Sequence, residues 1–182
     1  MKHRRPQQAQ RTHAARQRGV TLLETFIALM IMVIVAGGLM GVFGYAAGQN
    51  KSQGEIATRT TEYAEDKMEQ LMALDFGDAV TNTTVYPSQP AGGSGLGGLM
   101  AGNQTVGGTD PKNPLANYAD YLDGSGTVVN NAAAGFYTRV WSIGTDATGN
   151  LKTITVVVGA KSTGGGTGGA PSTKLVCLKT NN

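Results

Sequence analysis

The sequence contains little of what most enzymes and disulfide-rich proteins need. Its two histidines, His3 and His13, lie within the first 19 residues, and Cys177 is the only cysteine. A single cysteine forms no internal disulfide and supplies neither a CxxC redox motif nor a multi-cysteine metal site. Without histidine after residue 19, most acid–base and nucleophilic constellations are excluded there. We therefore expect no enzymatic activity, no cofactor and no metal.

Acidic residues are also missing, from every position before Glu24. The same N-terminal stretch holds six of the 15 basic residues, namely Lys2, Arg4, Arg5, Arg11, Arg16 and Arg18. The chain as a whole carries a net charge of +3, but residues 20–182 contain nine basic and twelve acidic residues, a net charge of −3. The basic character thus belongs to the N-terminus alone, and we expect no direct nucleic-acid binding by the remainder.

The longest feature present is a run without charge. Thr25 to Asn50 is 26 residues long and rich in Ile, Leu, Met and Val. A membrane-spanning helix needs roughly 20 such residues. Because basic flanks stay in the cytoplasm, residues 51–182 are expected on the outer side.

An ordinary secretory signal peptide is the alternative for this run, with a cut among the small residues Ala46 to Gly48. Such a signal has an apolar core of about 7 to 15 residues, which is shorter than this run. Glu24 at its cytoplasmic edge would have no role there. The mature chain would then be a secreted or membrane-anchored adhesin.

The residues Gly19-Val20-Thr21-Leu22-Leu23-Glu24, followed by the apolar run, resemble the class III prepilin signature of type IV pilins and type II secretion pseudopilins. The resemblance covers roughly residues 16–45. It implies that a prepilin peptidase cuts after Gly19 and methylates the new amine of Val20, where the family usually has Phe or Met. It further implies other pilin or pseudopilin subunits, the inner-membrane assembly platform and membrane lipid as partners. The chain would be a single-pass inner-membrane protein before assembly and part of a pilus or periplasmic pseudopilus afterwards.

Glu24 is the residue expected to direct assembly. An ionised carboxylate in the apolar layer costs about 2.5 kcal/mol or more, so it needs a partner. The new amine of Val20, its own or a neighbour's, is that partner, and cleavage creates it. The alternatives are that Glu24 is solvated at the headgroup boundary and that Gly19 is a turn residue before the helix.

Five glycines weaken the second half of the apolar run: Gly37, Gly38, Gly41, Gly44 and Gly48. Each costs about 1 kcal/mol of helix propensity relative to Ala, while spacings of four allow helices to approach closely. Major pilins usually carry proline where this chain has Gly41, so the resemblance is greater to minor pilins and minor pseudopilins.

Beyond Lys51 the pattern predicts that the helix continues as an amphipathic segment. Its apolar side carries Ile56, Thr60, Ala64, Met68, Leu71 and Met72. Glu55 and Arg59 are spaced for an i, i+4 pair. Glu62, Glu65, Asp66 and Glu69 form a solvated acidic face, which in an alternative interpretation docks a basic partner subunit.

Residues 77–134 are predicted as loop, with a glycine-rich centre at 91–98 and a short helix or packed segment at Tyr118 to Leu122. Asp120, Asp123 and Ser125 surround Gly124, which favours a turn over a calcium site because the spacing is not that of an EF-hand.

Three β-rich runs follow, Phe136–Ile143, Lys152–Ala160 and Lys174–Leu178, and predict an antiparallel meander. We expect Ile154, Val156, Val158 and Val140 to face the helix, with Trp141 and Tyr137 on the other side. Cys177 is expected to pack as a small apolar residue, with an intermolecular disulfide as the alternative.

The sequence therefore predicts an α+β, type IV pilin-like fold: a long N-terminal helix packed on a small antiparallel sheet of about three strands. The expected parts are a leader (1–19), a membrane and filament-core helix (20–50), an amphipathic extension (51–76), a glycine-rich loop region (77–134) and a β-meander head (135–182). The expected function is that of a filament-subunit precursor.

Overall fold

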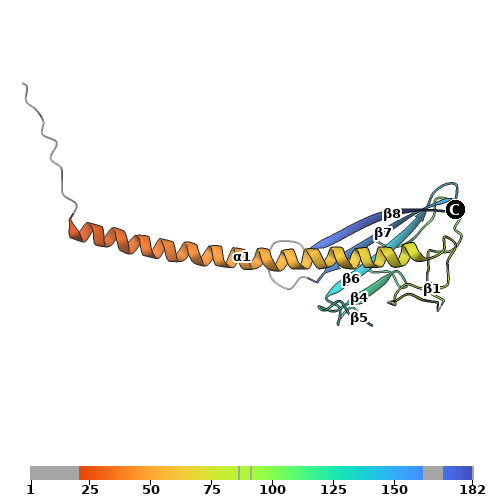
Figure 1. The fold of residues 1–182 in the computed structure, drawn as a ribbon, viewed down its shortest axis with the longest axis horizontal. Helices are drawn as coiled ribbons and strands as arrows, with labels where there is room; N and C mark the ends of the chain where they lie inside the picture. Colours follow the sequence, from red (N-terminus) through yellow and green to blue (C-terminus); the bar gives the residue numbers. More distant parts are fainter. Residues whose placement is uncertain (1–20, 86, 91, 162–169, 182) are drawn as a thin grey trace, which may run out of the picture. The chain divides into compact units, whose positions relative to one another are not determined.

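The computed structural model describes residues 21–85, 87–90, 92–161 and 170–181. Within them the chain forms one helix and eight strands (Figure 1). These are α1 (Leu22–Ala73), β1 (Thr81–Asn82), β2 (Gln89–Pro90), β3 (Thr105–Gly107), β4 (Ala119–Leu122), β5 (Val128–Val129), β6 (Tyr137–Thr145), β7 (Leu151–Ala160) and β8 (Ser172–Thr180). By its contacts the chain divides between Ala47 and Gly48 into two units, and we call the second one the head.

The helix α1 has 52 residues and defined ends. At its start the Thr21 hydroxyl accepts a hydrogen bond of 3.4 Å from the Glu24 amide, as an N-cap residue does. Its last turn contains no basic residue of its own. Instead the Lys179 ammonium, from β8, donates to the Met72 carbonyl at 2.7 Å and so satisfies a carbonyl that the helix leaves free. The helix ends three residues before the predicted limit at residue 76.

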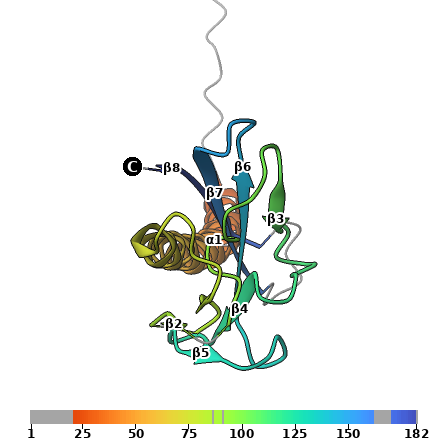
Figure 2. The same cartoon turned by 90° about the vertical axis from the view of Figure 1, so that its right-hand side faces the viewer.

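The main sheet is antiparallel, with the order β5-β4-β6-β7-β8, and β3 also pairs with β6 (Figure 2). Strands β6, β7 and β8 are consecutive in sequence and adjacent in space, which confirms the predicted meander. On the other side of β6, β4 pairs with Tyr137–Val140 and β3 with Ser142–Gly144. β1 and β2 form a separate two-stranded ribbon. The coarse prediction, one long N-terminal helix packed on an antiparallel sheet, is therefore confirmed, while the sheet has six strands instead of about three.

The prediction that residues 77–134 are loop was wrong. Strands β1 to β5 lie there, and Ala119–Leu122 is a strand, where the sequence suggested a short helix or a segment packed under the loop. These strands have only two to four residues, too few for an alternating pattern to show in the sequence. β3 and β4 pair directly with the long edge of β6, whose free backbone groups need partners. β5 pairs with β4, and β1 pairs with β2.

The predicted facing of β6 was also wrong. Trp141 lies opposite Val156 and Ile143 opposite Ile154, so these side chains share the face that packs on α1. Val140 lies opposite Val157 on the outer face, where both are buried without belonging to the core cluster. Paired residues on antiparallel strands point the same way, and the error arose from a register one residue off.

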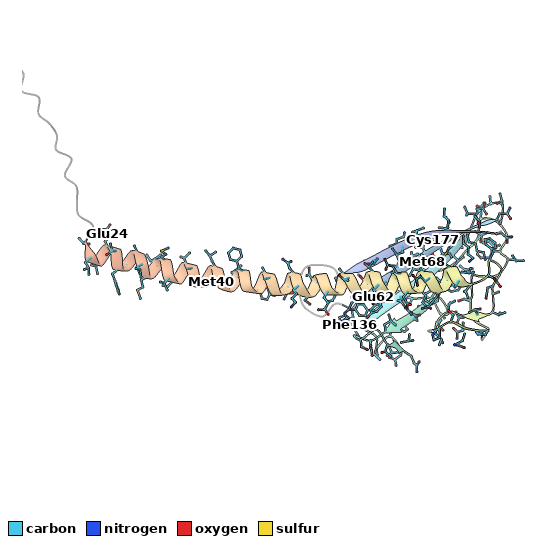
Figure 3. The ribbon with its side chains drawn as sticks, viewed as in Figure 1. Glu24, Met40, Glu62, Met68, Phe136 and Cys177 are labelled. Atoms are coloured by element: carbon cyan, nitrogen blue, oxygen red, sulfur yellow. The ribbon has the colours of Figure 1, made fainter. Side chains whose placement is uncertain are left out.

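The core of the head lies between α1 and the sheet (Figure 3). The helix contributes Ala64, Met68 and Leu71, and the strands contribute Tyr137, Trp141, Ile143, Ile154, Val156 and Val158. Cys177 packs against this cluster, half-buried, as predicted for a small apolar residue. Thr60, also expected on the apolar side, is buried and its hydroxyl lies 2.9 Å from that of Thr173 on β8.

Candidate functional site

The first half of α1 has an apolar surface that no described part of the chain covers. Residues 21–55 are all exposed. α1 is long and apolar enough to cross a membrane, and none of its most apolar 18-residue window is buried inside the chain. A helix that is hydrophobic all round belongs in lipid or against other helices. The fold of the chain therefore leaves this surface for an environment or partner outside it.

Glu24 lies in the first turn of this apolar helix (Figure 3). Its backbone amide donates to the carbonyl of Thr21 at 3.0 Å and to the Thr21 hydroxyl. Its carboxylate, in contrast, has no ion-pair or hydrogen-bond partner among residues 21–85 or elsewhere in the described chain. A helix N-terminus stabilises a nearby carboxylate by about 0.3–1 kcal/mol, which does not offset the cost of about 2.5 kcal/mol for an unpaired charge inside lipid.

Gly19 and Val20, the predicted cleavage and methylation positions, lie outside the described residues. Val20 precedes Glu24 by four positions in the sequence. If the helix begins where it is described, at Leu22, a chain cut before Val20 would carry its new amine two residues ahead of the first turn.

No steric contact within the described chain requires glycine at five positions of α1. A Cβ added at Gly37, Gly38, Gly41, Gly44 or Gly48 would meet no atom within 4 Å, apart from the helix's own neighbouring backbone. Each nevertheless weakens the helix by about 1 kcal/mol relative to Ala. In membranes, small residues at such spacings let two helices approach closely.

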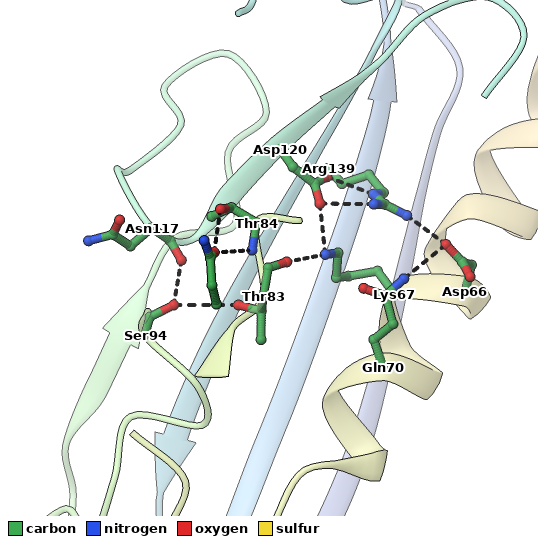
Figure 4. Close-up of polar contacts among 10 residues, drawn as sticks. Asp66, Lys67, Gln70, Thr83, Thr84, Ser94, Asn117, Asp120 and Arg139 are labelled. Carbon is green, nitrogen blue, oxygen red and sulfur yellow. Dashed lines mark hydrogen bonds and ion pairs between the residues drawn. The ribbon is translucent and has the colours of Figure 1, made fainter. Parts of the chain in front are cut away.

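The head contains a buried network of charges that the sequence analysis missed (Figure 4). Asp120 on β4 forms ion pairs with Lys67 of α1 at 2.7 Å and with Arg139 of β6 at 2.6 Å. Arg139 also donates through a second nitrogen to Asp120 and through a third to Asp66 at 2.8 Å. The Lys67 ammonium donates to the Thr83 carbonyl and lies 4.5 Å from the centre of the Trp141 ring.

Burial and pairing act on these cations in opposite directions. Burial lowers the pKa of Lys67 from its ordinary 10.5 to about 8, with Asp120 opposing the shift and Arg139 adding to it. Burial also opposes the charge of Arg139, but the carboxylates of Asp120 and Asp66 outweigh it and raise the pKa of the guanidinium. A buried ion pair adds little net stability, whereas removing one partner costs about 3–5 kcal/mol. We therefore expect the network to specify the arrangement of α1, β4 and β6 more than to stabilise it.

A second buried lysine holds the segment that follows the helix. The Lys152 ammonium, on β7, donates to the carbonyls of Phe76, Leu96 and Gly98 at 2.5–2.8 Å. It also lies 4.6 Å from the centre of the Phe76 ring. Burial lowers its pKa, and Lys179 adds to the effect. Three acceptors satisfy all three ammonium protons, so Lys152 has a structural role.

A weak signal for these buried charges exists in the sequence. Lys67 lies on the apolar side of the helix, three residues after Ala64 and four before Leu71, and Arg139 alternates with Tyr137 and Trp141. Periodicity therefore predicts that Lys67 and Arg139 lie in the core, but it does not predict which acid pairs with them. Asp66 was predicted to lie on the solvated acidic face, and this was wrong, because it pairs with Arg139. Glu62, Glu65 and Glu69 are exposed as expected, and Glu55 pairs with Arg59 at 3.4 Å.

The two aspartates considered as calcium ligands, Asp120 and Asp123, bind other groups of the protein. Asp120 belongs to the buried network, whereas Asp123 accepts hydrogen bonds from Ser125 and Thr127 and closes the turn between β4 and β5. The hydrogen bonds lower the pKa of Asp123. No group of three or more His, Cys, Asp or Glu side chains that could hold a metal occurs in the described part of the chain.

Comparison with protein-family models, with curated proteins and with solved structures finds no match to this chain.

Proposed function

We propose that the chain is the precursor of a type IV pilin-like filament subunit, a minor pilin or pseudopilin. A prepilin peptidase cuts it after Gly19 and methylates Val20, and the apolar half of α1 then packs with other subunits in a type IV pilus or a type II secretion pseudopilus. The observation that carries this proposal is Glu24, which has no partner among the described residues and lies in the first turn of an apolar helix, five residues after Gly19.

The proposed steps are linked by charge. Before cleavage the basic leader holds the N-terminus on the cytoplasmic side of the inner membrane. Cleavage removes the leader and leaves a cationic amine on Val20. This amine, on the same or a neighbouring subunit, pairs with Glu24 and removes the cost of a lone charge in lipid. An inner-membrane assembly platform would extract subunits from the lipid only when this pair can form.

An ordinary signal peptide fits the helix less well. A cut at Ala46 to Gly48 would fall in the middle of α1, which continues without a break to Ala73. The product would lose the whole uncovered apolar half. This supports a cut before the helix, and the adhesin alternative predicts a mature chain beginning near Gln49.

The N-terminal mass of the membrane-extracted protein tests the proposal. The protein is produced in cells with and without a prepilin peptidase, extracted in detergent and analysed intact and by N-terminal peptide. We expect a chain starting at Val20 with one added methyl group, formed only when the peptidase is present. A start near Gln49, or the same product in both strains, would rule the proposal out.

A further inference from the structure

A groove on the head lies between the exposed side of α1 and the β4–β5 hairpin. We call it the acidic groove. Its volume is about 640 Å³, and its lining includes Glu62, Glu65 and Glu69 of α1, Leu122 and Val128 of the hairpin, and Arg139. Apolar atoms and the half-buried ion pair between Arg139 and Asp66 thus form part of its walls, and the other acids lie along one side.

The acids of this groove repel one another. Glu62 and Asp66 are four residues apart, as are Glu65 and Glu69, which are the spacings at which like charges destabilise a helix. Asp66 is relieved by Arg139. Among the described residues none of the other three acids has an ion-pair partner. A cation from outside the chain would relieve this repulsion.

A second surface of the head carries exposed lysines. We call it the lysine hollow, a depression of about 610 Å³ whose lining includes Lys112, Lys161, Thr138 and Ser172, with Asp110 among the residues around it. Lys174 follows Ser172 by two positions on the same face of β8. Lys112, Lys161 and Lys174 are exposed, and among the described residues no ion pair involves them, although Lys161 donates a hydrogen bond of 3.4 Å to the Ala133 carbonyl. The head's other lysines in the sheet, Lys152 and Lys179, are engaged by backbone carbonyls.

The two surfaces lie on opposite faces of one sheet. Thr138 lines the lysine hollow and Arg139 lines the acidic groove, and neighbouring residues of a strand point to opposite faces. One copy therefore cannot join its own two surfaces. Two copies can join them only head to tail, and a contact of this kind repeats into an open polymer unless its rotation closes a ring.

We propose that the acidic groove of one head receives Lys112, Lys161 and Lys174 of a second copy of the chain. This contact rests on the proposed function, because α1 in a filament would bring heads close together. It adds a side-by-side contact between heads that selects copies of this chain. Like charges in contact cost several kcal/mol, so the pairing also disfavours groove-to-groove arrangements.

Charge reversal with exchange tests this contact. The full-length triple variants E62K/E65K/E69K and K112E/K161E/K174E are produced separately and together in cells with the assembly machinery, and sheared filaments are quantified. Each variant alone should yield at least about tenfold fewer filaments, since a loss of 1.4 kcal/mol per contact is already tenfold. Produced together, the two should restore filaments, because each reversed surface then meets its complement. The pair E55K and K51E, exposed charges outside both surfaces, serves as the control, and the emission of Trp141 reports whether the head is folded.

Zero-length carbodiimide cross-linking identifies the contact directly. Filaments containing ¹⁴N and ¹⁵N copies should give mixed-isotope peptides that join Glu62, Glu65 or Glu69 to Lys112, Lys161 or Lys174. Wild-type filament yield from either reversed variant alone, or no mixed-isotope cross-link between these residues, would overturn the contact and leave the proposed function standing. A wild-type chain that is uncut and forms no filaments would overturn the proposed function and this contact with it.

Discussion

Lys67 of the helix and Asp120 of β4 form an ion pair of 2.7 Å in which the lysine side chain has no exposed surface and the aspartate only 2%. The two residues are 53 positions apart in the sequence. Arg139 reaches the same carboxylate from β6, so Asp120 is the single anion that two buried cations share.

Replacing Asp120 with Asn should destabilise the head by about 3–5 kcal/mol, because Lys67 would lose its anion and Arg139 would keep only Asp66. Trp141 is the only tryptophan and has no exposed surface, so its fluorescence during urea unfolding in detergent measures the effect. Asp123→Asn, in the exposed turn nearby, is the matched control and should cost much less. Equal stability of the two variants would contradict the role assigned to Asp120.

The stability of the head should depend on pH through Lys67. The pKa of this lysine is about 8 in the folded state and 10.5 in its ordinary state, so between these values the unfolded chain binds more protons. The free energy of unfolding of the wild type should therefore rise with pH across this window relative to that of Lys67→Met, by on the order of 1–3 kcal/mol. Below pH 8 the two stability curves should run parallel. Urea titrations of the two proteins at pH 7 to 10.5 give the difference. The difference in stability between the wild type and Lys174→Met, a substitution at an exposed position, should not change with pH across this window.

Lys152→Met should loosen the segment after the helix, because the carbonyls of Phe76, Leu96 and Gly98 would lose their common donor inside the protein. Limited proteolysis followed by mass spectrometry should show faster cleavage within residues 76–98. The variant Lys152→Arg is a second test, since the guanidinium keeps the charge but is too large for three convergent acceptors. Unchanged cleavage in both variants would show that the segment is held by other contacts.

Glu24→Ala should be cut normally but enter filaments poorly, because the amine of Val20 would lack its anion. The fraction of mutant in sheared filaments, produced together with the wild type, measures this. Glu55→Ala removes an exposed acid further along the same helix and should be incorporated like the wild type. Equal incorporation of Glu24→Ala would argue that this residue is simply solvated at the headgroup boundary.

Gly19→Phe should leave the uncut precursor in the inner membrane, because a bulky side chain blocks the access that a protease needs at the bond it cuts. An immunoblot of membrane fractions separates the two lengths, and Gly48→Ala is the control within the helix. A normally shortened product from Gly19→Phe would place the cut elsewhere.

The features that depend on local physics follow from the amino-acid sequence. A charge-free run of 26 residues forms a helix long enough for a membrane, whatever the head does. The side of the helix around Ala64, Met68 and Leu71, and the three-strand meander, also follow from periodicity, because a helix and a strand repeat their own faces at 3.6 and 2 residues.

The remaining features depend on contacts between segments that are far apart in the sequence. Whether Trp141 or Val140 faces the helix depends on a register between β6 and β7, and a shift of one residue exchanges the two. The short strands β3 and β4 form where β6 offers them an edge, and β5 in turn pairs with β4. The meeting of Lys67, Asp120 and Arg139 joins three elements far apart in the chain, and no local pattern records which buried charge finds which partner.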